Sequence, residues 1–292
     1  MRHIHAEQRT AADATGSIAI GQVAHNLVRE PNGIWSARSA TAISYPDEGN
    51  ARCLALEEHS FWFRHRNECI LAAMDLYPPA GAVFDIGGGN GFVASALQSA
   101  GREVVLVEPG PAGAVNARAR GLRHVICATL ESAGFGPHVA PAVGLFDVLE
   151  HIADDVGFLC RLRDVLMQGG RLYITVPAYR LLWSVEDDYA GHFRRYTLRT
   201  LVSALQRSGF TIDFATYIFA LLPVPILLTR SLPSRLGIRR DVSLSTEQRE
   251  HDPGGGPVRA LLEWTLRREL HAVHGGRPLP FGGSCLVVAS AA

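Results

Sequence analysis

The sequence contains no lysine, because all 28 of its basic residues are arginine. Without a side-chain amine, the chain cannot use Schiff-base catalysis or hold a lysine-linked pyridoxal cofactor. The 28 basic residues are balanced by 28 acidic ones, so the formal net charge is zero. Since a dedicated nucleic-acid-binding protein usually has a basic excess, we expect no nucleic-acid partner.

Cysteine is also scarce, and none of the five cysteines stands in a C-x-x-C pair. An odd number of unpaired cysteines favours reduced thiols over a disulfide framework. Residues 1–10 are polar and lack the apolar core of a secretion signal. Together these features predict a cytoplasmic protein.

Long apolar runs are missing as well. The best candidate, residues 214–229, spans 16 residues and is interrupted by Pro223 and Pro225. A membrane-spanning helix needs roughly 20 apolar residues, so we expect no transmembrane segment. The run predicts a strand followed by a packed helix, with an apolar surface for a lipid-like ligand as the alternative.

Strand and helix patterns alternate through most of the chain, which predicts an α/β, doubly wound, mostly parallel sheet with helices on both faces. Residues 1–44 lack sustained periodicity and predict a loose N-terminal arm, followed by one domain over 45–292 with an insertion near 222–257. A helix is expected over 54–77. Strands are expected at 81–86, 103–108, 123–127, 142–148, 171–177, 210–218 and 283–291.

A glycine-rich turn is the most informative motif. The strand predicted at 81–86 carries Asp85 near its end and is followed by Gly87, Gly88, Gly89 and Gly91. Glycine lets a ligand approach the backbone closely, and the following helix offers free N–H groups to an anion. The next strand ends in Glu108, placed to accept hydrogen bonds from ribose hydroxyls. A tight turn without a ligand is the alternative interpretation.

The spacing separates two classes of ligand. A dinucleotide fingerprint needs Gly-x-Gly-x-x-Gly, but its third glycine would fall at Phe92, which argues against an NAD-dependent oxidoreductase. The observed Gly-x-Gly-x-Gly with Asp85 before it resembles the first motif of the class I S-adenosylmethionine (SAM) methyltransferases. This resemblance, extending over about residues 54–291, implies a Rossmann-like, seven-stranded sheet of order 3-2-1-4-5-7-6, whose seventh strand is antiparallel.

The end of the fourth predicted strand carries Asp147, Glu150 and His151 at positions i, i+3 and i+4. They could cap the next helix, or His151 could be a general base. A third interpretation is a metal site, because this spacing can put three ligands on one face of a helical turn. The stretch is similar to ubiquinone-biosynthesis O-methyltransferases, in which an acid-x-x-Glu-His element holds a divalent ion such as Mg²⁺.

Residues 179–196 follow the fifth predicted strand and combine Trp, Asp, His, Arg and Tyr side chains. They resemble a loop of a bacterial subset of SAM methyltransferases. An ordered loop of internal ion pairs is one interpretation. The other places His192 and Tyr196 against the methyl acceptor, with His192 as a second candidate base. Arg194 and Arg195 could then bind an anionic acceptor.

Further cofactor contacts are implied by the resemblance. Trp62 could stack on the sulfonium and Arg66 could pair with the methionine carboxylate, although this aromatic segment could equally be core. Thr129 stands where family members usually have an acid that contacts adenine, and its hydroxyl can still accept a hydrogen bond. The remaining candidate cofactor contacts are Pro109, Leu130, Phe146 and Asp147.

These features predict a SAM-dependent methyltransferase acting on a small molecule, with O-methylation preferred. The acceptor could be a hydroxylated aromatic, a quinone precursor, a sugar or a lipid-linked intermediate. A non-catalytic partner protein with the same fold is the alternative, although Asp85, the glycines and Glu108 are all present.

Overall fold

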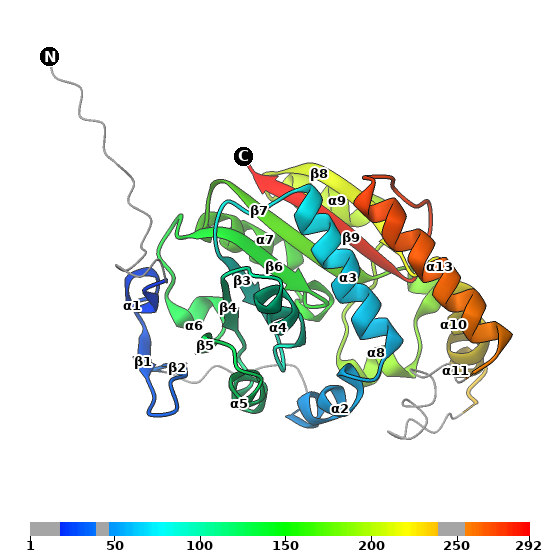
Figure 1. The fold of residues 1–292 in the computed structure, drawn as a ribbon, viewed down its shortest axis with the longest axis horizontal. Coiled ribbons are helices and arrows are strands. Elements are labelled where there is room, and N and C mark those ends of the chain that lie inside the picture. Colours follow the sequence, from blue (N-terminus) through cyan, green and yellow to red (C-terminus); the bar gives the residue numbers. More distant parts are fainter. Residues whose placement is uncertain (1–17, 39–46, 239–254) are drawn as a thin grey trace, which may run out of the picture.

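The computed structural model describes residues 18–38, 47–238 and 255–292, and it is built around one nine-stranded sheet (Figure 1). The strand order is β1-β2-β5-β4-β3-β6-β7-β9-β8. The seven strands from β5 to β8 therefore follow the predicted order, and β9 runs antiparallel between β7 and β8. The strands are β1 (Leu27–Arg29), β2 (Trp35–Ala37), β3 (Val83–Ile86), β4 (Val104–Val107), β5 (His124–Cys127), β6 (Ala140–Phe146), β7 (Leu166–Pro177), β8 (Phe210–Ile218) and β9 (Ser284–Ala291).

Two strands extend the sheet beyond the seven that the sequence predicts. The sequence predicts a loose arm over 1–44, but residues 18–38 form a short helix and the β1–β2 hairpin. Trp35 pairs in parallel register with Ile126 of β5. Ile20, Val23 and Leu27 are buried in the core, so this part of the arm is held by apolar packing. The rest of the predicted arm, residues 1–17 and 39–44, lies outside the described residues.

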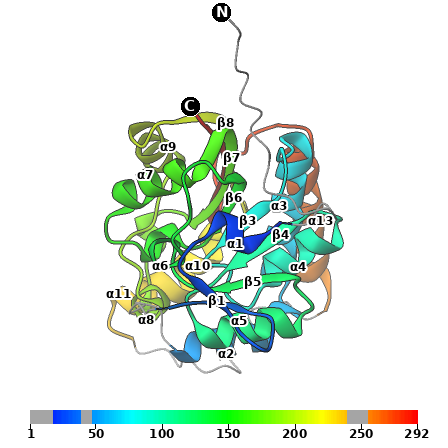
Figure 2. The same ribbon diagram turned by 90° about the vertical axis from the view of Figure 1, so that its left-hand side faces the viewer.

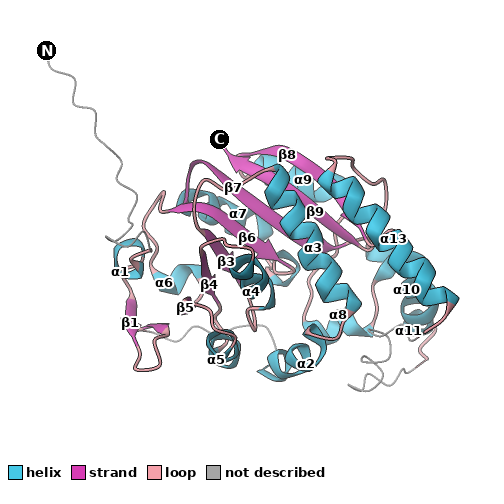
Figure 3. Cartoon of the chain, in the orientation of Figure 1, coloured by secondary structure: helices cyan, strands magenta, loops and turns pink. Residues whose placement is uncertain are grey.

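Helices cover both faces of the sheet, as Figures 2 and 3 show. One face packs α3, α4, α5 and α13 over one buried apolar cluster, and the other packs α1, α6, α7 and α9 over a second. The helices are α1 (Ile20–Val23), α2 (Asp47–Glu57), α3 (Phe61–Leu76), α4 (Phe92–Ser99), α5 (Pro111–Ala119), α6 (Leu130–Ala133), α7 (Asp155–Val165), α8 (Val185–Ala190), α9 (Leu198–Arg207), α10 (Pro223–Ile226), α11 (Leu232–Arg235) and α13 (Pro257–His274).

The predicted helix over 54–77 is two helices. Ser60 lies between them, and its hydroxyl accepts the backbone N–H groups of Trp62 and Phe63. This serine cap starts α3 and separates it from α2. As a result α2 lies across the carboxyl ends of the strands, while α3 packs on the sheet (Figure 1).

The carboxyl ends of β3, β4 and β6 lie at one edge of the sheet because these strands are parallel neighbours. All four residues of β3 and of β4 are buried, as expected for strands covered by helices on both faces. Among the described residues, no helix is both long and apolar enough to span a membrane.

A buried carboxylate ties α13 to the sheet and to α3. Glu269 accepts the N–H of Phe219 at 2.6 Å and that of Ala220 at 2.9 Å, and it lies 2.7 Å from Nε2 of His65. Phe219 in turn stacks on Trp62 with ring centroids 5.4 Å apart. The carboxylate thus positions one wall of the candidate site.

We expect Glu269→Ala to lower the free energy of unfolding by about 3 kcal/mol, since it leaves buried donors without an acceptor. Urea unfolding of the full chain measures this. Glu263→Ala on the same helix is the matched control, because Glu263 is partly exposed and its ion pairs within the described part of the chain are with Arg259 and Arg267. Equal losses in the two variants would contradict the structural role of Glu269.

Candidate active site

The glycine turn follows β3 and opens into a cavity of about 900 Å³. Gly87 and Gly89 have φ angles of 71° and 55°, which favour glycine. A Cβ at Gly88 would come within 2.8 Å of the Asp85 carboxylate, whereas a Cβ at Gly89 would meet nothing within 4 Å. Gly89 therefore presents bare backbone to the cavity.

Two carboxylates stand at the ends of β3 and β4. Glu108 accepts the N–H of Gly89 at 2.8 Å and that of Gly110 at 2.7 Å, which fixes the turn beside the cavity. Asp85 is 1% exposed. Neither of its carboxylate oxygens has a hydrogen-bond partner among the described residues. Burial raises the pKa of Asp85 to about 7, against the opposing effect of Arg66 and with a further contribution from Glu108.

A cation next to the Asp85 carboxylate would stabilise its ionised form, because the carboxylate has no hydrogen-bond partner among the described residues. Burying an unpaired charge is costly, and a bound ligand with an ammonium group would supply a partner. Burial also raises the pKa of Glu108, although the two backbone N–H groups oppose this. Asp85 therefore sits in an environment that a cationic ligand group would complete, whereas both oxygens of Glu108 already accept backbone N–H groups.

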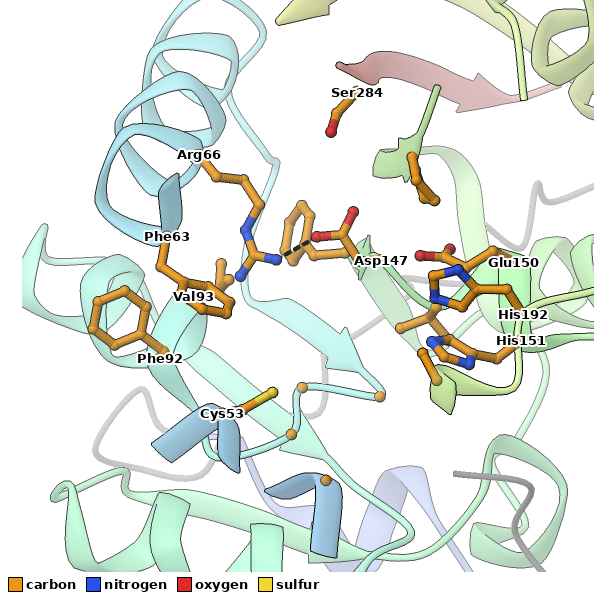
Figure 4. Close-up of a pocket in the computed structure, with 18 of the residues that line it drawn as sticks. Cys53, Phe63, Arg66, Phe92, Val93, Asp147, Glu150, His151, His192 and Ser284 are labelled. Atoms are coloured by element: carbon orange, nitrogen blue, oxygen red, sulfur yellow. Dashed lines mark hydrogen bonds and ion pairs between the residues drawn. The ribbon is translucent and has the colours of Figure 1, made fainter. Parts of the chain in front are cut away.

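The aromatic-arginine segment of α3 forms another wall of the cavity. Trp62 lines the cavity and also packs on Phe219, while its contact with a sulfonium stays a prediction. The Arg66 guanidinium lies 4.9 Å from the Trp62 ring centroid and forms an ion pair with Asp147 (Figure 4). Arg66 is thus placed at the cavity but is engaged by a protein carboxylate.

Asp147 is held away from the predicted metal cluster. Its φ of 55° is unusual for a residue other than glycine. One oxygen pairs with Arg66, and the other accepts the Thr175 hydroxyl at 3.1 Å. The set Asp147, Glu150 and His151 therefore does not converge; instead Glu150, His151 and His192 place one ligand atom each within 4.8 Å of one another.

Figure 4 shows this second cluster facing the cavity from the side opposite Arg66. The His151 and His192 rings meet edge to face with centroids 4.6 Å apart. Burial and the neighbouring His192 lower the pKa of His151 to about 4, so this imidazole is neutral at pH 7. Burial, together with the nearby Asp147, raises the pKa of Glu150 well above its usual value.

His192 is oriented by a buried aspartate. Its Nδ1 lies 2.8 Å from Oδ1 of Asp187, which also accepts Nε of Arg195 at 2.7 Å. Despite its burial, bonds from His192 and Arg195 lower the pKa of Asp187 to about 2. Because an ionised carboxylate only accepts hydrogen bonds, Nδ1 carries the proton, and in the neutral form of this tautomer Nε2 is the acceptor.

Several predicted residues lie elsewhere. Tyr196 does not line the cavity: it is 4% exposed, and its hydroxyl donates to Asp155 at 2.8 Å. The expectation that it faces an acceptor is therefore not met, because its ring joins the core. Gly91 starts α4 beneath the turn, where a Cβ would lie 2.7 Å from Leu122. Arg194 pairs with Asp155, whereas Arg195 lines the cavity but pairs with Asp187, so both loop arginines are engaged within the protein.

The other predicted cofactor contacts all line the cavity. Thr129 also caps α6, because its hydroxyl accepts the N–H of Ser132 at 3.0 Å. The hydroxyl is thus already used as an acceptor. The lining residues predicted from the sequence are Trp62, Arg66, Asp85, Gly87, Gly88, Gly89, Glu108, Pro109, Thr129, Leu130, Phe146, Asp147, Glu150, His151, His192 and Arg195.

Other lining residues come from segments with no recognisable motif. Asn50, Arg52 and Cys53 of α2 contribute, as does Ser284 at the start of β9. The side chain of Asn90 donates to the backbone carbonyl of Asn50 at 2.8 Å, so the glycine turn itself holds α2 over the cavity. In the described part of the insertion, the cavity-lining residues are Leu222, Pro225, Ile226, Thr229 and Arg230.

Residues 59–213, more than half of the chain, match the model of the methyltransferase domain family. The chain belongs to this family. No curated protein shows significant similarity to it. The predicted class I SAM-dependent methyltransferase resemblance is therefore confirmed, while the narrower resemblance to ubiquinone-biosynthesis enzymes stays a prediction.

Solved structures show the same methyltransferase fold. One match comes from the complex between the Haloferax volcanii Trm112 methyltransferase activator and a methyltransferase, with 17% identity, a TM-score of 0.54 and coverage of 86% of this chain and 99% of that one. Haemonchus contortus phosphoethanolamine N-methyltransferase 2, in complex with SAM, matches with 17% identity and a TM-score of 0.51, over 84% of this chain and 57% of that one. A Thermotoga maritima SAM-dependent methyltransferase matches with 17% identity and a TM-score of 0.50, over 84% and 94%.

Proposed function

We propose that the chain transfers the methyl group of SAM to a hydroxyl of a small-molecule acceptor. The observation that carries this proposal is that one cavity joins the glycine turn and its two carboxylates to the imidazoles of His151 and His192. One end suits the cofactor and the other suits proton transfer. The family match supports the methyltransferase class.

The residues present fit SAM. Asp85 offers an unpartnered, buried carboxylate to the ammonium group of the methionine part, and Glu108 stands at the end of β4, where a ribose would lie. Phe146 and Leu130 supply apolar walls. When bound, SAM provides an electrophilic methyl group for in-line attack. The protein contributes positioning and exclusion of water.

His192 is the residue we assign as general base. Its Nδ1 is fixed by Asp187, which leaves Nε2 free to take the proton of an acceptor hydroxyl. His151 is the weaker candidate, since a pKa of about 4 makes its neutral imidazole a poor proton acceptor. It contributes by packing edge to face on His192 and holding the base toward the cavity.

The acceptor end of the cavity is formed partly by Leu222, Pro225 and Ile226. These apolar side chains favour an acceptor with an aromatic or lipid-like body. Arg194 and Arg195 are paired with aspartates, so we do not assign them to an acceptor anion. The alternative, a partner protein without catalysis, is not favoured by any of these contacts.

Release of S-adenosylhomocysteine tests the proposal. The full chain, supplied with SAM, should release this product faster with hydroxylated aromatic acceptors than with matched amines. If only the amines were methylated, the assigned reaction would be N-methylation rather than O-methylation. No turnover with either class, while SAM still binds, would favour the partner-protein alternative.

A divalent ion such as Mg²⁺ was suggested by the sequence at Asp147, Glu150 and His151. These residues do not fit Mg²⁺, because Asp147 is engaged by Arg66 and Thr175. The cluster that does form has two imidazoles and one carboxylate, whereas Mg²⁺ prefers oxygen ligands. We therefore derive no catalytic step through Mg²⁺.

Two metal experiments should give opposite results. EDTA should leave methyl transfer unchanged, since no step uses Mg²⁺. Added Zn²⁺ should inhibit it, because nitrogen ligands with one carboxylate suit zinc and coordination would occupy His192. Glu150→Gln should weaken the zinc inhibition. Loss of activity in EDTA that Mg²⁺ restores would contradict this assignment.

A further inference from the structure

The outer side of the insertion carries a row of exposed apolar side chains. Helix α10, the π-helical turn Leu227–Ser231 (η3) and α11 follow one another without a break. Exposed leucines and one valine recur every three or four positions, so they share one helical face. We call this face the apolar ridge; its residues, with exposed fractions, are Leu221 (41%), Val224 (63%), Leu228 (57%), Leu232 (38%) and Leu236 (74%).

The segment that carries the ridge is basic. Its described part, residues 214–238, contains Arg230 and Arg235 and no aspartate or glutamate. A further exposed leucine, Leu181 at 55%, adjoins the ridge, because Arg235 donates to its carbonyl oxygen at 2.8 Å. An apolar face bordered by arginine is typical of helices that bind at a lipid surface.

The acidic residues of the neighbouring α8 do not neutralise this face. Asp187 is buried in its ion pair with Arg195. Asp188 accepts the indole N–H of Trp183 at 3.0 Å, and Glu186 lines the cavity. Helix α8 lies near α11 (Figures 1 and 2). Because its three acidic side chains are engaged elsewhere, the outer face of the insertion stays basic and apolar.

We propose that the apolar ridge, with Arg235 beside it, docks the protein on an anionic lipid bilayer. Apolar side chains would enter the headgroup region while the arginines meet anionic lipids, each contributing on the order of 1 kcal/mol. A second copy of the chain is a poorer partner for the ridge. In a two-fold contact the same patch of both copies would meet, which would bring the arginines of both copies close together.

The apolar ridge and part of the cavity wall lie on the same helical segment. Leu222, Ile226 and Thr229, on the same helical segment, line the cavity, while the ridge faces outward. A bilayer against the ridge would therefore lie next to the acceptor end of the cavity. That the acceptor is drawn from the membrane rests on the proposed function, whereas the docking itself does not.

Vesicle flotation of the full chain tests the docking. The protein should float with vesicles of phosphatidylcholine containing about one-third phosphatidylglycerol and should not float with phosphatidylcholine alone. Raising the salt to about 0.5 M should weaken binding. The double substitution Val224→Glu and Leu228→Glu should reduce binding at least tenfold, on the order expected for two apolar side chains and added repulsion.

Val115→Glu is the matched control, because Val115 is 53% exposed on α5 and should leave flotation unchanged. Titration with SAM should give the same affinity for all three proteins, which separates this test from that of the proposed function. The proposal is overturned if the wild-type chain does not float, or if the double variant floats equally well. It is also overturned if light scattering shows a dimer that the double variant dissolves, without any vesicle binding.

Discussion

Asp85→Asn should stabilise the protein at pH 8 and weaken its binding of SAM. The Asp85 carboxylate is buried without a hydrogen-bond partner among the described residues, and its pKa is raised to about 7. At pH 8 the wild-type chain must therefore hold an unpaired charge when SAM is absent. Asparagine removes that charge, and we expect a gain on the order of 2 kcal/mol in the free energy of unfolding.

The sign of the pH dependence follows from the raised pKa. In the unfolded chain Asp85 ionises near pH 4, and in the folded chain near pH 7. Between these values the unfolded state binds fewer protons, so the contribution of Asp85 to stability falls as the pH rises from about 4 to about 7. The stabilisation in Asp85→Asn should thus be small at pH 4 and largest above pH 7.

Binding of SAM should show the opposite trend. A cationic ammonium prefers the ionised carboxylate, so wild-type affinity should increase as the pH rises through 7. In Asp85→Asn this increase should be absent, and affinity at pH 8 should fall about tenfold or more. Urea unfolding and calorimetric titration at several pH values measure the two effects.

Asp164→Asn is the matched control, because Asp164 is exposed and pairs only with neighbouring Arg163 among the ion pairs described. It should change neither quantity. If Asp85→Asn destabilised the protein at pH 8 and left SAM affinity unchanged, Asp85 would be a structural group rather than a cofactor ligand.

His192→Ala should lower the rate constant of methyl transfer to a hydroxyl about a hundredfold or more. The physical reason is the loss of the Nε2 acceptor that Asp187 orients. The affinity for SAM should stay near the wild-type value, because the imidazole lies at the other end of the cavity from Asp85 and Glu108. Single-turnover kinetics, together with SAM titration, separate these two effects.

Two further measurements distinguish a base from a packing residue. Acceptors whose hydroxyl is already ionised at the assay pH should be methylated by His192→Ala at a rate closer to that of wild type. His59→Ala, an exposed position, should behave as wild type. If His192→Ala and His151→Ala both left turnover unchanged, positioning alone would account for the rate and the base would be discarded.

The seven central strands could be predicted because each is a short apolar run bounded by breakers. Their order followed from the resemblance to the class I methyltransferases, which the glycine turn carries. The same signals are weak near the N-terminus. The hairpin of β1 and β2 has three residues in each strand, which is too short for a period to emerge. Its place in the sheet depends on packing of Ile20, Val23 and Leu27 rather than on local pattern.

The cofactor end of the candidate site was predictable for a related reason. Asp85, the glycines and Glu108 follow directly after strands, and the ends of parallel strands converge at one edge. The cavity-lining residues of α2 carry no such signal. Their position depends on Ser60, which ends one helix pattern and begins another, and on the contact between Asn90 and the backbone of Asn50.

At the end of the cavity that holds the two histidines, the grouping of side chains could not be predicted from sequence spacing, because it depends on the folded backbone. Helical spacing suggested that Asp147 would join Glu150 and His151, but the unusual backbone angle of Asp147 turns it toward Arg66 and Thr175. His192 takes its place, from a loop more than 40 residues away in the sequence. Tyr196 lies in the same loop and points into the core, a choice that loop composition does not reveal.

Calorimetric titration of the full chain with SAM tests the central claim most directly, that the cavity at the glycine turn is a SAM site. We predict saturable binding in the micromolar range, with S-adenosylhomocysteine competing for the same site. We also predict that Glu108→Ala weakens it, since the turn loses the acceptor of the Gly89 and Gly110 N–H groups. A folded wild-type sample that bound neither compound would contradict the account and leave a methyltransferase fold without its cofactor.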